Sequence, residues 1–151
     1  MKIAVSSDMW TPLVETLFSE LKKRGHEWEY FGPKENEENQ DWPLVTMQAS
    51  EQISRGACDE GIVLCWTGTG ASIVANKTKG IRAALCVDAE TAKGARKWNH
   101  ANVLALSLRL ISFAIMEEIL DAWFSTDFDL DPWNQTQVKR VQYLDKEPDS
   151  Q

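Results

Sequence analysis

Histidine and cysteine are scarce in this chain of 151 residues, which contains two of the first and three of the second. The cysteines, Cys58, Cys65 and Cys86, are odd in number and show no Cys-x-x-Cys spacing, which argues against a disulfide framework or a structural zinc site. His26 and His100 leave little material for a histidine-based metal site. We therefore expect neither a metal nor another cofactor.

Long apolar runs are absent as well. No stretch approaches 18 uninterrupted apolar residues, so a transmembrane helix is not expected. The first eight residues lack the apolar region of a signal peptide, and we expect a cytoplasmic protein. The net charge of −7 argues against nucleic acid as the main partner, because phosphate backbones require clustered Lys and Arg. A local basic pocket for a small phosphate remains compatible with this charge.

Tryptophan, in contrast, is abundant for this length. Large, rigid apolar side chains suit pockets and interfaces, so we expect several of them to line one. The length fits a single domain over residues 1–144, followed by a polar tail over 145–151 that we expect to be frayed. The tryptophans are Trp10, Trp28, Trp42, Trp66, Trp98, Trp123 and Trp133.

Short apolar runs alternate with amphipathic stretches along the chain. This alternation predicts a three-layer α/β/α, Rossmann-like fold with a five-stranded parallel sheet and helices on both faces. Ligands of such sheets bind beyond the carboxyl ends of the strands, where we expect Asp8, Cys65, Asp88 and the segment around Asn99. We expect strands at 2–6, 27–31, 61–65, 81–87 and 102–106, and helices at 12–25, 43–55, 71–77, 89–97, 111–124 and 134–143.

The segment 61–77 is the most informative one. An apolar strand ends at Cys65, and a turn rich in Gly and Thr then leads into a helix. Because a helix N-terminus attracts negative charge and favours the thiolate, Cys65 is a candidate nucleophile or base beside an anion-binding turn. The alternative is a core residue, since cysteine is among the most buried residue types.

The same turn permits a second interpretation. Gly68 and Gly70 could belong to a dinucleotide-binding fingerprint, with Asp88 near the position of a ribose-binding acid. However, Ile73 occupies the third glycine position, and the loop follows the third strand instead of the first. This interpretation is therefore the weaker one.

Taken together, the segments resemble the ribose-5-phosphate isomerase B family, which also contains the galactose-6-phosphate isomerase subunits. The resemblance implies an aldose–ketose isomerase that shuttles a proton between C1 and C2 of a sugar phosphate through a cis-enediolate. It also implies a homodimer, or a dimer of dimers, with the active site at the interface. It is carried by Met1–Val5 with Asp8, Asp41–Pro43, Cys65–Lys77, Gly80–Ala83, Asn99–Leu104, Arg109 and Arg140-Val141.

The resemblance also implies roles for individual residues. Cys65 corresponds to the base that removes the C2 proton, and Thr67 to a hydroxyl that relays a proton between the sugar oxygens. A helix-entry loop suits an anion hole for the enediolate, formed here by the backbone N–H groups of Gly68, Thr69, Gly70, Ala71 and Ser72. The substrate-binding residues are then Asp8 and Asn99 for hydroxyls, Trp42 as a pocket aromatic, and Arg109 and Arg140 for phosphate.

The chain departs from the family pattern around this core. Met9 and Trp98 stand where the family has histidines, and Trp66 replaces a glycine, so we expect all three in the altered substrate pocket. An indole cannot act as the general acid that opens a sugar ring. His100 is adjacent to Asn99, but its side chain is expected to point elsewhere. Residues 132–137 replace a Gly-Gly-Arg-His string and leave Arg140 alone, although Lys97 could restore part of the charge.

We therefore expect the family chemistry on an altered substrate. A short or open-chain sugar phosphate, such as a tetrose phosphate, needs no ring opening and fits a pocket narrowed by Trp66 and Trp98. The first alternative is ribose-5-phosphate isomerase B activity itself. The second is a subunit that binds a sugar phosphate without turning it over.

Overall fold

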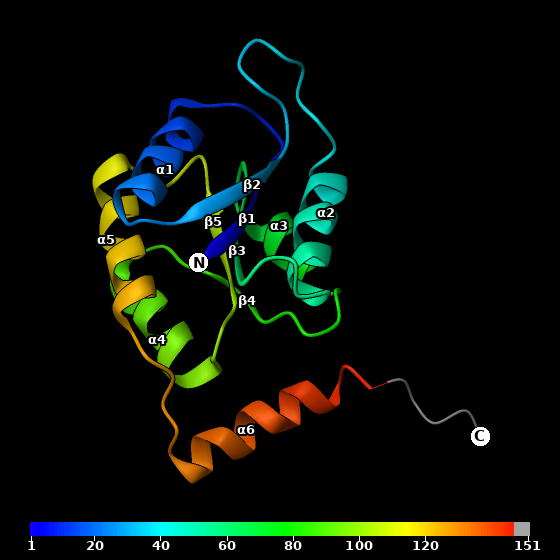
Figure 1. The fold of residues 1–151 in the computed structure, drawn as a ribbon, viewed down its shortest axis with the longest axis vertical. Coiled ribbons are helices and arrows are strands. Elements are labelled where there is room, and N and C mark those ends of the chain that lie inside the picture. Colours follow the sequence, from blue (N-terminus) through cyan, green and yellow to red (C-terminus); the bar gives the residue numbers. More distant parts are fainter. Residues whose placement is uncertain (147–151) are drawn as a thin grey trace, which may run out of the picture.

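One sheet of five parallel strands organises the chain, and the computed structural model describes residues 1–146 of it. The strand order is β2-β1-β3-β5-β4, so β3 lies in the middle and β4 is an edge strand (Figure 1). The strands are β1 (Lys2–Ser7), β2 (Glu27–Phe31), β3 (Glu60–Cys65), β4 (Ala83–Leu85) and β5 (Val103–Ser107).

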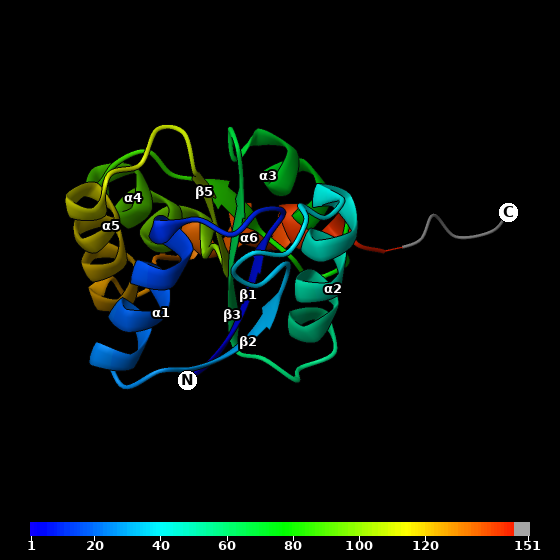
Figure 2. The same ribbon diagram turned by 90° about the horizontal axis from the view of Figure 1, so that it is seen from above.

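Helices cover both faces of the sheet, which confirms the predicted three-layer α/β/α architecture (Figure 2). On one face lie α1 (Pro12–Lys23), α4 (Ala89–Asn99) and α5 (Phe113–Ser125); on the other lie α2 (Trp42–Ser54) and α3 (Thr69–Ala75). The last helix, α6 (Pro132–Tyr143), lies outside these layers, next to the start of β4 (Figure 1). Within residues 1–146, no helix is long and apolar enough to cross a membrane.

The alternation of side chains along β3 divides the core into two parts. Ile62 and Leu64 pack against the α1, α4 and α5 layer, whereas Val63 and Cys65 pack against α2 and α3. All six residues of β3 are buried, as expected for a strand covered on both faces. The Cys65 side chain therefore points to the face of the sheet that α2 and α3 cover.

The bounds of most elements differ by a few residues from the sequence expectation, and three of these differences have a clear physical reason. β4 spans three residues, and the side-chain amide of Asn76 accepts from Ala83 N (2.9 Å) and donates to Ala83 O (2.9 Å), which satisfies the backbone of Ala83 on this edge strand. α3 begins at Thr69, because Gly68 turns the chain into the helix. α6 begins at Pro132, where Asp131 caps the helix. The expected frayed tail lies, from residue 147 onward, outside the described residues.

Candidate active site

A cavity of about 310 Å³ opens at the carboxyl ends of β1 and β3. Its volume is at the lower end of the range for small-molecule sites. Three chain segments form it: the end of β1, the start of α2 and the turn between β3 and α3. The lining residues are Asp8, Trp42, Cys65, Trp66, Thr67, Thr69 and Gly70, and the sequence analysis named each of them as a site residue. We call this space the Cys65 cavity.

Cys65 is held firmly at the end of β3. Its backbone pairs with Ser107 of β5, and its carbonyl accepts hydrogen bonds from Gly68 N (3.2 Å) and Leu108 N (3.0 Å). The residue is 5% exposed, yet it lines the cavity. It is therefore both a core residue and accessible to a small ligand. Cys86 has no such opening: it is fully buried, and burial raises the pKa of its thiol to about 12.

The turn after Cys65 requires glycine at two positions. Gly68 has φ +74°, and a Cβ there would lie 2.6 Å from Leu85 Cδ1 and 2.9 Å from the Leu106 carbonyl carbon. Gly70 lies beneath the indole of Trp42, whose ring atoms would be 3.0 Å from an added Cβ. Glycine thus allows both the left-handed turn and the close approach of Trp42.

Three of the five expected anion-hole amides have no hydrogen-bond acceptor in the described part of the chain, and two of these three, Thr69 and Gly70, belong to residues that line the cavity. Gly68 N donates to Cys65 O (3.2 Å), and Ser72 N donates to Gly68 O (3.0 Å), so both are engaged in the turn itself. The amides of Thr69, Gly70 and Ala71, at the first turn of α3, donate to no acceptor within residues 1–146. Thr67 Oγ1 lies 2.7 Å from Thr69 Oγ1, which places two hydroxyls beside these amides.

Asp8 adds a carboxyl group to the wall of the cavity. Its Oδ1 is buried and has no hydrogen-bond partner in the described part of the chain. Burial raises the pKa of this carboxyl group, because removal from water disfavours the charged form. Its backbone carbonyl accepts from Gln40 N (2.8 Å), which ties the acidic loop before α2 to the site. Met9 does not line the cavity.

The end of β5 fixes Trp66 at this cavity. The Trp66 carbonyl accepts hydrogen bonds from Ser107 Oγ (2.9 Å) and Arg109 N (3.0 Å), while its indole stays 53% exposed. Arg109 is thereby held beside Trp66, although its exposed side chain lines no cavity described here. It is the one expected phosphate ligand next to the Cys65 cavity in the same chain.

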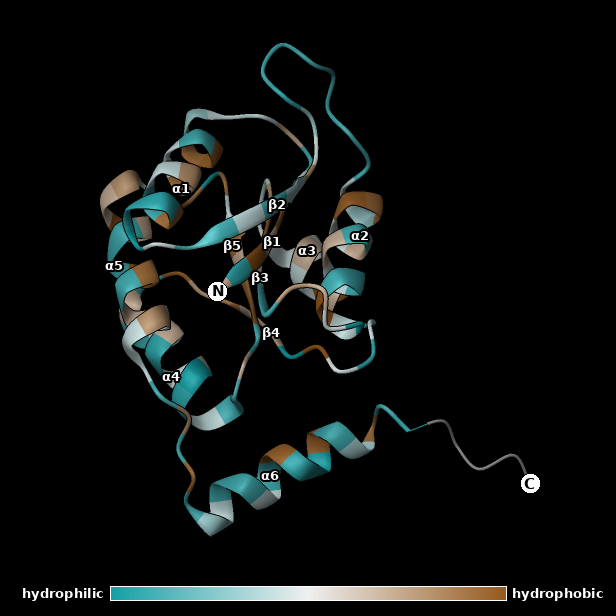
Figure 3. Cartoon of the chain, viewed as in Figure 1, coloured by the Kyte–Doolittle hydropathy of each residue, from teal (hydrophilic) through white to brown (hydrophobic). Residues whose placement is uncertain are grey.

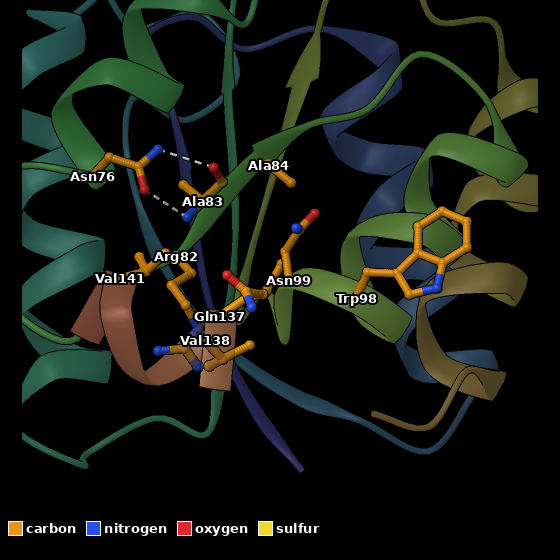
Figure 4. Close-up of a pocket in the computed structure, with 10 residues that line it drawn as sticks. Asn76, Arg82, Ala83, Ala84, Trp98, Asn99, Gln137, Val138 and Val141 are labelled. Carbon is orange, nitrogen blue, oxygen red and sulfur yellow. Dashed lines mark hydrogen bonds between the residues drawn. The ribbon is translucent and has the colours of Figure 1, made fainter. Parts of the chain in front are cut away.

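Trp98 and Asn99 line a different cavity, of about 280 Å³, between β4, the end of α4 and α6 (Figure 4). The expectation that the segment around Asn99 lies at the carboxyl edge of the sheet is wrong for a single chain. α4 follows β4 and returns antiparallel to the strands, so its last turn lies where β5 begins. We call this second space the Asn99 cavity.

The Asn99 cavity contains polar groups that the sequence analysis did not assign. The partly buried guanidinium of Arg82 donates from Nε to His100 O (2.9 Å), and burial lowers its pKa. Gln137 Oε1 accepts from Arg140 Nη1 (3.0 Å), which places Arg140 beside this cavity although it does not line it. In Figure 4 the indole of Trp98 extends away from Arg82 and Gln137. The exposure of Arg82 depends on how α6 packs, and the sequence around Arg82 does not predict this packing.

His100 and Asp88, two candidate site residues, have structural roles. The ring of His100 stacks on Phe128 (centroids 4.5 Å apart) and lines neither the Cys65 nor the Asn99 cavity. Asp88 caps α4 by accepting from Thr91 N (2.7 Å), and this bond lowers the pKa of its carboxyl group. Both residues are thus engaged in local structure.

Comparison with known proteins identifies the family of the chain. The model of the Ribose/Galactose Isomerase family matches residues 3–142. The chain belongs to this family. Ribose-5-P isomerase B of Listeria innocua is 36% identical over 85% of this chain and 86% of that protein. D-erythrulose-4-phosphate isomerase of Pectobacterium atrosepticum is 37% identical over the same shares of the two chains.

A solved structure gives the same result for the fold. Ribose-5-phosphate isomerase B from Mycoplasma genitalium, with bound ribulose-5-phosphate, matches with a TM-score of 0.89 and 30% identity over 97% of each chain. The predicted family, the α/β fold and the assignment to sugar-phosphate isomerases of the aldose–ketose class are therefore confirmed.

Proposed function

We propose that the chain interconverts an aldose phosphate and a ketose phosphate, with Cys65 as the base that removes the C2 proton. One observation carries this proposal: Cys65 and Thr67 line the same cavity as Thr69 and Gly70, whose amides are unengaged within residues 1–146. Strand pairing and the backbone hydrogen bonds at Cys65 O hold the thiol in place before a substrate arrives.

The reaction needs no external oxidant or reductant. The Cys65 thiolate removes the proton from C2, the electron pair forms the C1–C2 double bond, and the aldehyde oxygen becomes an enediolate oxygen. The amides of Thr69, Gly70 and Ala71 stabilise this negative charge. The Thr67 hydroxyl passes a proton between O1 and O2, and the Cys65 thiol then returns its proton to C1 to give the ketose. Asp8 binds a substrate hydroxyl.

The Cys65 cavity of one chain is incomplete for a phosphorylated substrate. No Lys or Arg is among its lining residues, and the free amides of the turn are assigned to the enediolate, so a phosphate dianion needs cationic groups from elsewhere. Arg140 and Asn99 lie at the other cavity of the same chain. In the proposed homodimer, the Asn99 region of one copy covers the Cys65 cavity of the other, and Arg109 contributes from the chain that supplies Cys65.

A short or open-chain sugar phosphate, such as a tetrose phosphate, is the proposed substrate. Support comes from the small volume of the cavity and from the exposed indole of Trp66 at its wall. The relative that acts, by its name, on D-erythrulose 4-phosphate is as similar to this chain as the ribose-5-phosphate isomerase. Ribose 5-phosphate is the second candidate substrate, since the relative named ribose-5-P isomerase B is similar to this chain to the same degree.

A substrate panel tests the reaction. Tetrose, pentose and hexose phosphates, in aldose and ketose forms, are incubated with the protein in deuterated water, and exchange of the C2 hydrogen of each aldose is followed by NMR. The expected result is exchange with a tetrose phosphate that exceeds exchange with ribose 5-phosphate. Cys65→Ala should reduce it to background, and Cys58→Ala, a buried cysteine outside the cavity, should leave it unchanged.

Two results of the panel would contradict the proposal, one its catalytic role and the other its choice of substrate. If no substrate exchanges above the level of Cys65→Ala, the catalytic role fails; a sugar phosphate that still raises the thermal midpoint would then indicate a binding subunit. If ribose 5-phosphate exceeds every tetrose phosphate, the shift in substrate is refuted, while the chemistry stands.

A further inference from the structure

Few buried side chains attach α6 to the rest of the molecule. Of its 12 residues, Asn134 (4% exposed) and Val138 (6% exposed) are the buried ones. The hydropathy colouring shows mixed polar and apolar residues along the helix, in contrast to the apolar strands β3 and β5 (Figure 3). The position of α6, and of Arg140 on it, therefore depends on a small junction.

Asn134 makes the polar part of this junction. Its Nδ2 lies 3.1 Å from Asp129 O and 3.3 Å from Lys97 O, and Asp129 N donates to Lys97 O (2.9 Å). A side-chain amide has two hydrogens, so Asn134 can serve both carbonyl groups at once. The first turn of α6 is thereby bonded to the last turn of α4, which carries Trp98 and Asn99.

His100 forms the second part. It ends α4 in the left-handed conformation (φ +49°), which is uncommon for a residue other than glycine. Its Nε2 lies 2.9 Å from Asp129 O, and because a carbonyl oxygen only accepts, Nε2 carries the hydrogen. The contact of 3.3 Å between Nε2 and Asn134 Nδ2 is then one between two donors that share the Asp129 carbonyl.

Buried contacts connect this junction to the centre of the sheet. The ring of His100 stacks on Phe128, and the Arg96 guanidinium lies 4.5 Å from the centre of the same ring. Arg96 forms an ion pair of 2.8 Å with Glu60, at the start of β3, and Glu60 also accepts from Trp123 Nε1 (2.8 Å). The end of α4 and the start of α6 are therefore fixed relative to the core.

We propose that His100 and Asn134 are positioning residues, which hold Asn99 on α4 and Arg140 on α6 in one fixed arrangement for the Cys65 cavity of a second copy. This inference rests on the proposed function, because it assigns the presented residues to substrate binding. The left-handed turn at His100 ends α4 directly after Asn99, and the Asn134 amide holds the first turn of α6 against the last turn of α4. Neither side chain contacts the substrate.

Hydrogen–deuterium exchange tests the coupling without any substrate. Asn134→Leu removes both donors at similar size, and Gln142→Leu, which changes an exposed amide on the same helix, is the matched control. Asn134→Leu and His100→Ala should accelerate exchange in both segments, 95–102 and 130–142, while Gln142→Leu leaves both unchanged. Acceleration confined to 130–142 would overturn the coupling.

Kinetics test the consequence for the site. With the sugar phosphate identified by the panel, Asn134→Leu and His100→Ala should raise KM about tenfold and change kcat less than about threefold, since displaced binding groups weaken substrate binding first. His100→Asn should recover most of the loss, because Asn tolerates the left-handed conformation and carries an amide donor.

An unchanged KM in both variants would refute the positioning role. If the unmodified protein shows no isomerisation, the proposed function and the role in substrate binding fail together. The exchange experiment then still decides whether the two helices are coupled.

Discussion

At the scale of single residues, Asp8 carries a cost in stability at the proposed site. Its carboxyl group is partly removed from water, its Oδ1 has no partner in the described chain, and its pKa is raised. A charged group in this situation destabilises the folded state. The structure keeps it beside Cys65 all the same, where a substrate hydroxyl can supply the missing hydrogen bond.

Asp8→Asn should therefore stabilise the protein at neutral pH and impair catalysis. Because the folded state has the higher pKa, the stability linked to Asp8 is full below the unfolded value of 3.8 and is lost as pH rises through the folded pKa. We expect Asp8→Asn to raise the thermal midpoint at pH 7 by on the order of 2 °C, with a smaller gain near pH 4. The ratio kcat/KM should fall about 10- to 100-fold.

Thermal melts at pH 4 and 7, together with steady-state kinetics, check this prediction. A thermal midpoint that falls at pH 7 would mean that Asp8 stabilises the fold through contacts that its burial does not reveal. Burial likewise raises the pKa of the Tyr30 hydroxyl group, and the nearby charge of Asp8 raises it further.

At the scale of elements, the turn that enters α3 depends on Gly68. The left-handed conformation disfavours any other residue, and an added Cβ would collide with Leu85 and with the backbone of Leu106. Gly80 has a similar positive φ of +80°, but a Cβ there meets nothing within 4 Å. The two glycines thus separate the effect of conformation from the effect of steric overlap.

Gly68→Ala should lower the free energy of unfolding by about 2–4 kcal/mol, from the left-handed conformation plus the overlap. Gly80→Ala should lower it by about 1 kcal/mol, from the conformation alone. Urea denaturation, with the slope compared between variants, measures both. Equal losses in the two variants would show that the neighbours of Gly68 give way at no cost.

The secondary-structure elements are also the part of the structure that the sequence predicts best. The alternation of apolar runs and amphipathic stretches predicts every strand and helix, and the continuous segment from Cys65 to Gly70 brings most cavity residues with it. The prediction for Asn99 is wrong: Asn99 precedes β5 by a few residues, and a residue just before a parallel strand lies at the amino end of that strand. Arg82 and Gln137 could not be assigned, because their cavity exists through the packing of α6 on α4.

At the scale of the whole molecule, the expected site residues form two groups. One surrounds Cys65 at the carboxyl ends of the strands, and the other lies between β4, α4 and α6. The indoles of Trp66 and Trp98, one from each group, are 53% and 57% exposed. The chain has a net charge of −7, and no basic side chain of the described residues lines its Cys65 cavity. The proposed homodimer would supply donors for a phosphate from the second copy.

Mixing two inactive variants tests whether the two groups of residues come from different chains of a dimer. Cys65→Ala removes the base and Asn99→Ala removes a residue of the other group, so each homodimer should have less than a tenth of the original activity. In a mixed dimer, one site combines Cys65 of one chain with Asn99 of the other and is intact. With random exchange of subunits in an equal mixture, about one quarter of the original activity should return.

Mixing Cys65→Ala with the double variant that carries both changes is the matched control, because no combination of these chains gives an intact site. Kinetics before and after subunit exchange measure the recovery. If Cys65 and Asn99 acted within one chain, no intact site could form in either mixture, and the absence of recovery would refute the shared site. High activity of the Asn99→Ala homodimer would instead remove Asn99 from the residues proposed to bind substrate hydroxyls.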